Sequence, residues 1–152
     1  MGRTASGVRG IRLEKKNEVI AMEIADSEAV CLSVTELGFG KKTKFKEYRV
    51  QSRGGKGIIN VKVTSKNGPV VNVLTVHEED ELVIVTTGGM VVRCPVSQIR
   101  TSGRNAQGVH VIRLKNKQRV AAAIRVVEKE GAESAEGADQ LELQEEDEQE
   151  EK

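Results

Sequence analysis

The stretch SRGGKGIINVKV at residues 52–63 decides the fold, because it recurs along the chain without gaps. GRTASGVRGIRL at residues 2–13 and GRNAQGVHVIRL at residues 103–114 align with it, and one glycine coincides in all three. A self-similarity at a fixed period of about fifty residues is the signature of a repeat architecture. The sequence therefore predicts an array of similar structural units.

A second block supports the same period. ELGFGKKTKFKEYR at residues 36–49 aligns with TGGMVVRCPVSQIR at residues 87–100. Between the blocks lie short β-branched segments such as VVNVLTV and LVIVTT, bounded by glycine, asparagine or acidic turns, which is typical of strands. KNG at residues 66–68 and TGG at residues 87–89 predict hairpin-type turns.

Each complete unit is expected to hold four strands. In the first unit we expect them at about residues 8–13, 19–25, 29–34 and 39–48. The second unit repeats this pattern from residue 58 to residue 99, and the third stops after two strands. Four-stranded sheets at this period predict an all-β, propeller-like fold of about two and a half blades that bury their apolar faces against one another.

The expected domain organisation is a partial propeller followed by a tail. The propeller takes residues 1–130, with units at about 1–51, 52–102 and 103–130. Residues 131–152 are acidic and nearly devoid of large apolar side chains, so we expect them to be disordered. Because the units do not complete a ring and the first one starts abruptly, we expect the chain to be the C-terminal piece of a longer repeat protein.

The net charge of +1 conceals a strong asymmetry. Residues 1–127 hold 22 Lys/Arg against 11 Asp/Glu, whereas residues 128–152 hold 2 Lys against 12 Asp/Glu. A basic body with an acidic tail favours a polyanionic partner. We also hypothesise that the tail competes with this partner for the basic surface.

Motifs for catalysis or cofactor binding are absent from the sequence. His77 and His110 fall in different units, as do Cys31 and Cys94, and no metal-binding spacing occurs. No apolar run is long enough to cross a membrane. We therefore expect no metal, no cofactor, no small-molecule substrate, no membrane association and no catalysis by this chain alone.

The remaining signal is cationic. Residues 41–66 contain nine Lys/Arg and one acid, and residues 82–127 contain eight Lys/Arg and no acid. Cations at blade spacing could follow the phosphates of a duplex with little sequence specificity. Aromatic residues for stacking single-stranded bases are nearly absent, which favours bending and wrapping of duplex DNA instead.

QSRGGKG at residues 51–57 is the loop most suited to this role. Gly54, Gly55 and Gly57 permit positive φ and a close approach of the backbone to phosphate, and Arg53 and Lys56 add charge. A connector between blades that needs a tight path is the alternative interpretation. The glycine shared by all three units predicts a structural role, which places the functional weight on Gly54, Gly55 and Lys56.

GFGKKTKFKEYRVQSRGGKG at residues 38–57 closely resembles the gyrase A subunit of bacterial DNA gyrase. TSGRNAQGVHVIRL at residues 101–114 and SGVRGIRL at residues 6–13 resemble other blades of its C-terminal domain. The resemblance implies a β-pinwheel of six blades that wraps DNA around a basic rim. In that family a QRRGGKG box is needed for wrapping and for introducing negative supercoils.

This chain departs from the family pattern twice. Ser52 stands where the family box has Arg, and the loop enters a late blade, whereas the family box usually lies in the first one. The loop is therefore either the main box or a secondary one. Tyr48 lies in a blade strand and does not match the catalytic tyrosine of the family.

The charges and the resemblance together give a set of expected DNA-contacting residues. They are Gln51, Arg53, Gly54, Gly55, Lys56, Gly57, Lys41, Lys42, Arg49, Arg100 and Arg104. The implied partners are duplex DNA, the remainder of the gyrase A subunit and, through it, the gyrase B subunit, in the bacterial cytoplasm at the nucleoid. Two alternatives stay open: the C-terminal domain of a topoisomerase IV A subunit, and a propeller-type protein-interaction module.

Overall fold

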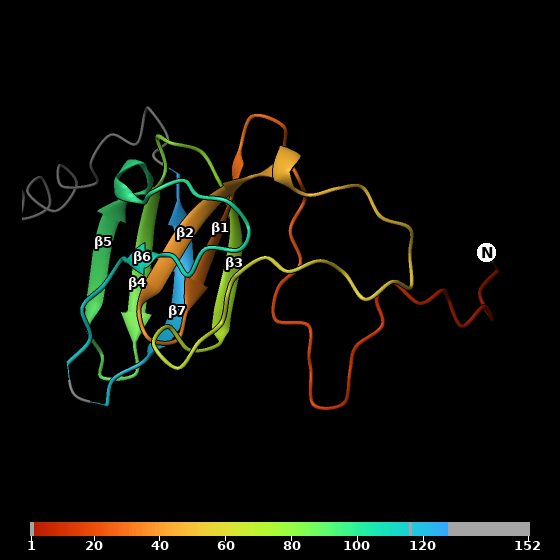
Figure 1. The fold of residues 1–152 in the computed structure, drawn as a ribbon, viewed down its shortest axis with the longest axis horizontal. Coiled ribbons are helices and arrows are strands. Elements are labelled where there is room, and N and C mark those ends of the chain that lie inside the picture. Colours follow the sequence, from red (N-terminus) through yellow and green to blue (C-terminus); the bar gives the residue numbers. More distant parts are fainter. Residues whose placement is uncertain (1, 116, 128–152) are drawn as a thin grey trace, which may run out of the picture.

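The computed structural model describes residues 2–115 and 117–127, which form two antiparallel sheets packed against each other (Figure 1). One sheet has the order β3-β1-β2-β6, and the other has the order β5-β4-β7. The strands are β1 (Val30–Thr35), β2 (Phe39–Lys44), β3 (Val70–Val76), β4 (Glu81–Thr86), β5 (Val91–Pro95), β6 (Val109–His110) and β7 (Val120–Val126). Short 3-10 helices, η1 (Phe45–Glu47) and η2 (Val96–Gln98), follow β2 and β5.

The sheets are shared between the sequence repeats. The first sheet takes β1 and β2 from the first repeat, β3 from the second and β6 from the third. The second sheet pairs β4 and β5 of the second repeat with β7 of the third. Each repeat therefore contributes edge strands to the sheets of the repeats before it, and no sheet is built from one unit alone.

This sharing explains why part of the strand prediction is wrong. Residues 8–13, 19–25 and 58–63 form no ladder, and only Val109–His110 of the third apolar segment is a strand. An extended segment becomes a strand only when a neighbouring backbone accepts and donates its hydrogen bonds. Residues 19–25 correspond to β3 and β7 in the repeat, but no β1-like or β4-like edge lies beside them in the described part of the chain.

One of the two predicted hairpin turns is present in the structure. Gly89 adopts φ +77° between β4 and β5, so the predicted hairpin at residues 87–89 is confirmed. The turn at residues 66–68 precedes β3 and joins no paired strands, because β3 pairs with β1.

The core lies between the two sheets, and its main cluster consists of aliphatic side chains. Its fully buried side chains come from the first sheet, through Leu32, Val34 and Val76, and from the second, through Leu82 and Ile84. Ile112 and Val120 of the third repeat join the same cluster. The prediction that Val, Ile and Leu carry the core is confirmed.

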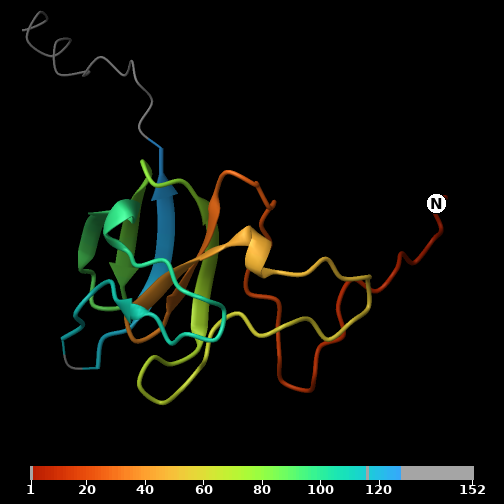
Figure 2. The ribbon, with the colours of Figure 1, turned by 45° about the horizontal axis from the view of Figure 1, so that its top comes forward.

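The segments that leave the sheets project from one side of this sandwich. Residues 2–25 and 49–57 extend together to the right of β3 in Figure 1 and away from the sheets in Figure 2. They carry apolar side chains that are largely exposed, such as Met22 at 92% and Ile24 at 88%. The predicted acidic tail and its disorder fall on residues outside the described part of the chain.

Candidate nucleic-acid interface

The glycine-rich loop at residues 51–57 is anchored on the first repeat through its backbone. The Gly54 amide donates to the Gly10 carbonyl at 2.8 Å, and the Gly55 carbonyl accepts from the Arg12 amide at 2.8 Å. Gly55 also forms a parallel bridge with Ile11. Because these contacts use main-chain groups, the side chains of the loop are left available.

Two glycines are required by the path of this loop. Gly54 has φ +77° and Gly57 has φ +81°, values that side-chain-bearing residues rarely adopt. The amides of Lys56 and Gly57 meet no acceptor within the described part of the chain. Free amides in a glycine-rich turn, with cations on both sides, form an environment suited to an oxyanion.

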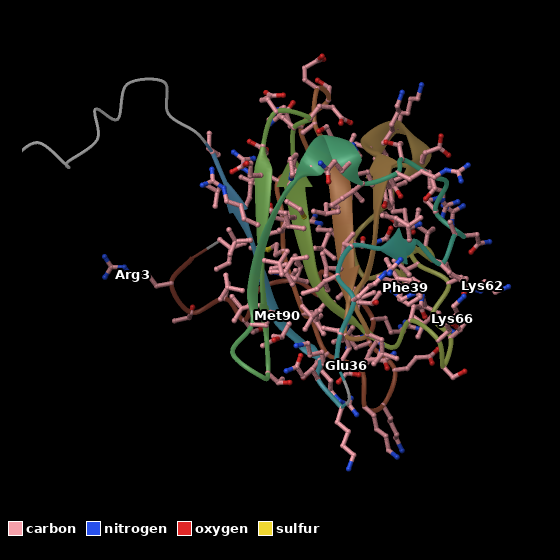
Figure 3. All side chains as sticks on the ribbon, turned by 90° about the vertical axis from the view of Figure 1, so that its left-hand side faces the viewer. Arg3, Glu36, Phe39, Lys62, Lys66 and Met90 are labelled. Carbon is pink, nitrogen blue, oxygen red and sulfur yellow. The ribbon has the colours of Figure 1, made fainter. Side chains whose placement is uncertain are left out.

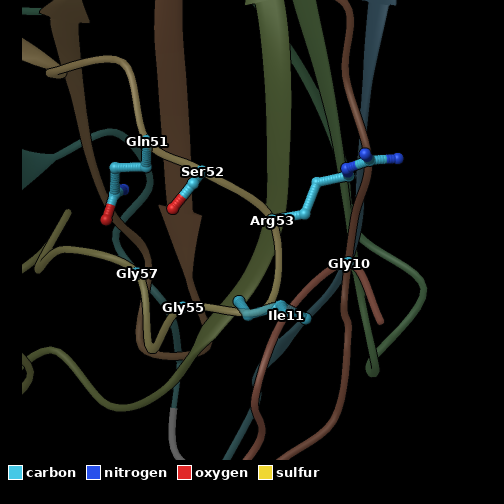
Figure 4. A pocket seen from close by; sticks show the side chains of 7 residues that line it. All are labelled: Gly10, Ile11, Gln51, Ser52, Arg53, Gly55 and Gly57. Carbon is cyan, nitrogen blue, oxygen red and sulfur yellow. The ribbon is translucent and has the colours of Figure 1, made fainter. Parts of the chain in front are cut away.

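A shallow pocket of about 250 Å³ lies where the loop meets the first repeat, lined by Gly10, Ile11, Gln51, Ser52, Arg53, Gly55 and Gly57 (Figure 4). The Arg53 side chain extends past Gly10, whereas Gln51 and Ser52 point to the other side of the loop. Three of the seven lining residues are glycine, and Arg53 is the only cation among them.

Both cations of the loop are exposed. The Nζ atom of Lys56 lies 3.9 Å from Oε1 of Glu14, and both side chains are 71% exposed. An ion pair of this kind is worth little in water and is weakened by salt. Lys56 can therefore exchange Glu14 for phosphate at small cost.

The third repeat docks in the same manner on the second. The Ala106 carbonyl accepts from the Lys62 amide at 3.2 Å, which is the repeat counterpart of the contact between Gly55 and Arg12. Nη1 of Arg104 donates to the Ile59 carbonyl at 3.0 Å. Arg104 is half-buried, and part of its guanidinium group is already hydrogen-bonded to the preceding repeat. Its counterpart Arg53 is exposed.

Lys41 and Lys42 do not lie at the surface. Both are buried, and Lys41 Nζ donates to the carbonyls of Gly103 and Arg104. Lys42 Nζ forms an ion pair of 2.5 Å with Oε2 of Glu78. They fasten the third repeat and the β3–β4 turn to β2, so we remove both from the set of expected phosphate contacts.

The electrostatics of Lys41 follow from this position. Burial lowers the pKa of Lys41 to about 8, and the nearby Arg104 acts in the same direction, while Cys31 acts in the opposite direction. The two carbonyl contacts satisfy the ammonium group that remains charged at neutral pH.

Arg49, Arg100 and Gln51 are exposed, as expected. No carboxylate of the described residues lies within ion-pair distance of Arg49, Arg53 or Arg100. The loops therefore present guanidinium groups that are not neutralised locally.

One set of exposed cations was missed by the sequence analysis. Arg12, Lys62 and Arg113 occupy the same position in the three repeats, and all are exposed. Their period of 50 and 51 residues was visible in the alignment of the repeats and was the signal that could have found them. Figure 3 places Lys62 and Lys66 at one side of the molecule, while Arg3 projects far from the sheets.

The aromatic residues are engaged inside the protein. Phe39 is buried and its ring centroid lies 3.9 Å from that of His110. Tyr48 donates to Oδ1 of Asn60 at 2.5 Å, and Asn60 donates to Oγ of Ser33 at 2.7 Å. Burial, with the neighbouring Cys31, raises the pKa of Tyr48 well above its usual range.

Other kinds of site find no support in the described residues. Within residues 2–115 and 117–127, no group of His, Cys, Asp and Glu is arranged to hold a metal ion. Over the same ranges, no helix has the length and apolar character needed to cross a membrane.

Comparison with known proteins assigns the family. The model of the DNA gyrase C-terminal domain, described as a beta-propeller, matches residues 1–26, 30–77 and 80–126. The chain belongs to this family. The predicted all-β propeller-like class and the resemblance to gyrase A are thereby confirmed.

Among relatives of this gyrase domain, the DNA gyrase A protein of Staphylococcus aureus strain MRSA252 is 45% identical over 130 residues. The match covers 84% of this chain and 15% of the relative, so the chain spans about 15% of the length of the curated relatives that it matches. The gyrase A protein of strain NCTC 8325 gives the same values.

Two solved structures are similar to this gyrase domain. A DNA gyrase A C-terminal domain is 26% identical with a TM-score of 0.62, covering 64% of this chain and 33% of that one. A C-terminal domain of DNA topoisomerase IV gives a TM-score of 0.72 at 20% identity, over 78% of this chain and 38% of that one. At that identity the second likeness shows a shared fold only.

Proposed function

We propose that this chain binds duplex DNA through phosphate contacts and bends it along the side on which the repeat loops lie. The observation that carries the proposal is the loop at residues 51–57. Its backbone is fixed on the preceding repeat, while Arg53 and Lys56 are exposed and two amides have no acceptor among the described residues. Such a loop binds an oxyanion without reading a base.

The charge balance of the surface supports this partner. Several described carboxylates already have cationic partners, as in the pairs of Glu36 with Arg119 and Glu78 with Lys42. Many exposed Lys and Arg side chains have no such partner among the described residues, including the repeated set Arg12, Lys62 and Arg113. A surface with excess cations at repeated positions attracts a linear polyanion and releases its condensed counterions.

The form of the nucleic acid follows from the aromatic residues. Proteins that hold single strands stack bases on exposed aromatic rings. Here Phe39 is buried, and Phe45 and Tyr48 are half-buried. Duplex DNA, held by its phosphates and bent against successive loops, is therefore the substrate that the surface fits best.

In the context of its family, the chain would act as part of a gyrase A subunit in the bacterial cytoplasm, at the nucleoid. It would wrap DNA while the remainder of that protein and the gyrase B subunit carry out cleavage and ATP hydrolysis, so that negative supercoiling belongs to the whole enzyme. The chain would then be non-catalytic. We retain the proposed division into repeat units at residues 1–130 and an acidic tail at residues 131–152.

The test is binding of a duplex of random sequence, measured by fluorescence anisotropy across a salt series. R53A/K56A should lower the affinity and reduce the slope of log K against log salt by about 2, because each lost phosphate contact removes about 0.9 from the slope. K115A/K117A, which removes the same charge from exposed positions in the turn before β7, is the matched control. Folding of each variant is checked by circular dichroism.

The outcome that overturns the proposal is the absence of salt-dependent DNA binding by the folded chain. An equal effect of both double variants would leave non-specific DNA binding but remove the special role of the loop. Binding of an acidic protein in place of DNA would favour the protein-interaction module instead.

A further inference from the structure

A buried ammonium group lies beneath residues 100–108, which we call the third-repeat loop. Lys41 is 1% exposed, and its Nζ atom donates to the Gly103 carbonyl at 2.8 Å and also to the Arg104 carbonyl. The Ala106 amide donates to the same Gly103 carbonyl at 3.2 Å, which closes a turn. Lys41 therefore holds the two peptide groups at the start of this turn.

The direction of these two carbonyls decides where the following amides point. In a planar trans peptide, the C=O of one residue and the N–H of the next point in opposite directions. Because the carbonyls of Gly103 and Arg104 point toward Lys41, the amides of Arg104 and Asn105 point away from it. Neither amide has an acceptor among the described residues. Two donors are thus presented on the side of the peptides opposite the buried ammonium group.

The third-repeat loop also has the groups that suit the loop at residues 51–57 to an anion. Its pocket of about 270 Å³ is lined by Arg100, Ser102, Ala106, Gln107, Gly108 and Val109. The amides of Gln107 and Gly108 have no acceptor in the described part of the chain, and the same holds for those of their counterparts Lys56 and Gly57. The two loops therefore offer the same kind of environment, a glycine-containing turn with unpaired amides beside a guanidinium group.

Lys41 acts on the outward amides through the peptide groups that it holds. A cation bound to a carbonyl oxygen polarises the peptide and strengthens the hydrogen bond that its N–H donates on the other side. Hydrogen bonds from a charged donor are also roughly twice as strong as neutral ones, so the ammonium form fixes these peptides most firmly. Nη1 of Arg104 is anchored on the Ile59 carbonyl, which keeps the guanidinium group beside the same turn.

The repeat itself indicates that the fold does not require lysine at this position. Val92 in β5 is the counterpart of Lys41 in β2. Burial of an amine opposes its charged form, and desolvation accordingly lowers the pKa of Lys41 to about 8. Lysine thus carries a cost here that valine at the equivalent position does not, which favours a functional reason for its presence.

We infer that Lys41 is a positioning residue for phosphate binding by the third-repeat loop, because it directs the amides of Arg104 and Asn105 outward and places a positive charge behind them. This assignment rests on the proposed function, and it adds a residue that acts on DNA without touching it. The loop docks on the first repeat through Lys41 and on the second through Ile59, and both contacts lie within the described residues.

The experiment compares K41M with K42M in anisotropy titrations of the complete chain with a duplex of random sequence, across a salt series at pH 7. Both variants remove one buried lysine from β2, but the Lys42 ammonium pairs with Glu78 and, among the described residues, not with the third-repeat loop. K41M should bind about three- to tenfold more weakly and lower the slope of log K against log salt by about 1, as for one lost phosphate contact. K42M should keep the affinity and the slope of the wild type.

Folding of both variants is established by circular dichroism and urea midpoints. K41V is the second variant if K41M does not fold, because it places at residue 41 the valine found at its counterpart Val92. It should reproduce the loss of affinity expected for K41M.

The pH profile separates positioning from folding. Because the pKa of Lys41 is lowered to about 8, the DNA affinity of the wild type and of K42M should fall from pH 7 to pH 9, toward that of K41M. Cys31 and Arg104 face the Lys41 ammonium, and Tyr48 faces Cys31 and Arg104 in turn. All three remain in K41M, whose affinity should change little over this interval. A group whose pKa is lowered by folding gives stability that rises with pH, so unfolding would not explain the fall.

The inference is overturned by equal losses in K41M and K42M, since the effect of Lys41 would then be one of net charge or stability. Wild-type affinity in a folded K41M or K41V would overturn it as well, and so would a pH profile that K41M shares with the wild type. Absence of DNA binding by the folded wild type is a separate result, which overturns the proposed function and the inference with it.

Discussion

Replacement of Gly108 by alanine tests whether the first sheet draws on all three repeats. Gly108 has φ +88°, and an added Cβ atom would lie 2.7 Å from the Gly40 carbonyl oxygen and 3.0 Å from its carbon. The backbone conformation alone costs a non-glycine residue roughly 1–2 kcal/mol. Displacing backbone that is already in contact adds about 1–3 kcal/mol, as overpacking does in other cores. We therefore expect G108A to lower the free energy of unfolding by about 2–5 kcal/mol.

Gly57 supplies a matched control at the same position of the second repeat. It has φ +81°, but its nearest neighbour to an added Cβ atom is Cδ1 of Ile11 at 3.8 Å, an ordinary contact. G57A should therefore lose at most the conformational cost of roughly 1–2 kcal/mol. The two variants therefore differ in whether the added Cβ atom meets the backbone of Gly40.

The assay is equilibrium unfolding in urea, followed by far-ultraviolet circular dichroism at a concentration where the chain is monomeric. The difference between G108A and G57A isolates the contact with Gly40. Equal losses in the two variants would refute the placement of β6 on β2, and with it the distribution of one sheet over three repeats.

Three further predictions concern buried polar groups. The pKa of Lys41 is lowered from 10.5 to about 8 in the folded chain, so between these two pH values the unfolded chain binds more protons than the folded chain. The stability of the wild type relative to K41M should therefore rise by up to about 3 kcal/mol from pH 8 to pH 10.5, which urea midpoints at several pH values would reveal. Because desolvation raises the pKa of Tyr48 above its usual 10.0, wild-type stability should fall above pH 10, and this fall should be smaller in Y48F. An unchanged profile would contradict the desolvation of the half-buried phenol. The side chain of Asp80 is 4% exposed, accepts a hydrogen bond from the His77 amide at 2.7 Å and lies beside Arg125. D80A should therefore lower the free energy of unfolding by about 2–4 kcal/mol in the same denaturation assay, whereas D26A, at an exposed position, should lower it by less than about 0.5 kcal/mol.

The strands could be predicted from the sequence where a segment pairs with another strand of the same repeat or the next one. Val30–Thr35 and Glu81–Thr86 are β-branched segments at the centre of their sheets, and the sequence predicts both within one or two residues. Residues 19–25 are mostly apolar, as β3 is, yet they form no strand. Period-two patterning reports the capacity to pair, while the presence of a partner depends on tertiary structure.

The burial of Lys41 and Lys42 could not be predicted for a related reason. FGKKTK is polar and carries two adjacent cations, which is typical of an exposed edge strand. In the structure five of its six residues are buried, because the third repeat passes over β2 from about sixty residues further along the chain. The glycine-rich loop was predicted correctly as an exposed cationic turn, since its flexibility and charge are local properties.

The division of each sheet among successive repeats has a consequence for biosynthesis. Gly40 pairs with Val109, so the outer edge of β2 at Gly40 stays uncovered until 69 further residues have been translated. At about 5–20 residues per second, this interval is roughly 3–14 s, during which the nascent chain presents an unpaired strand to other chains on the same messenger. Rare codons or a translational pause between β2 and β6 would lengthen this exposure, and faster elongation would shorten it. The yield of correctly folded protein should therefore depend on the speed of the ribosome across this part of the message.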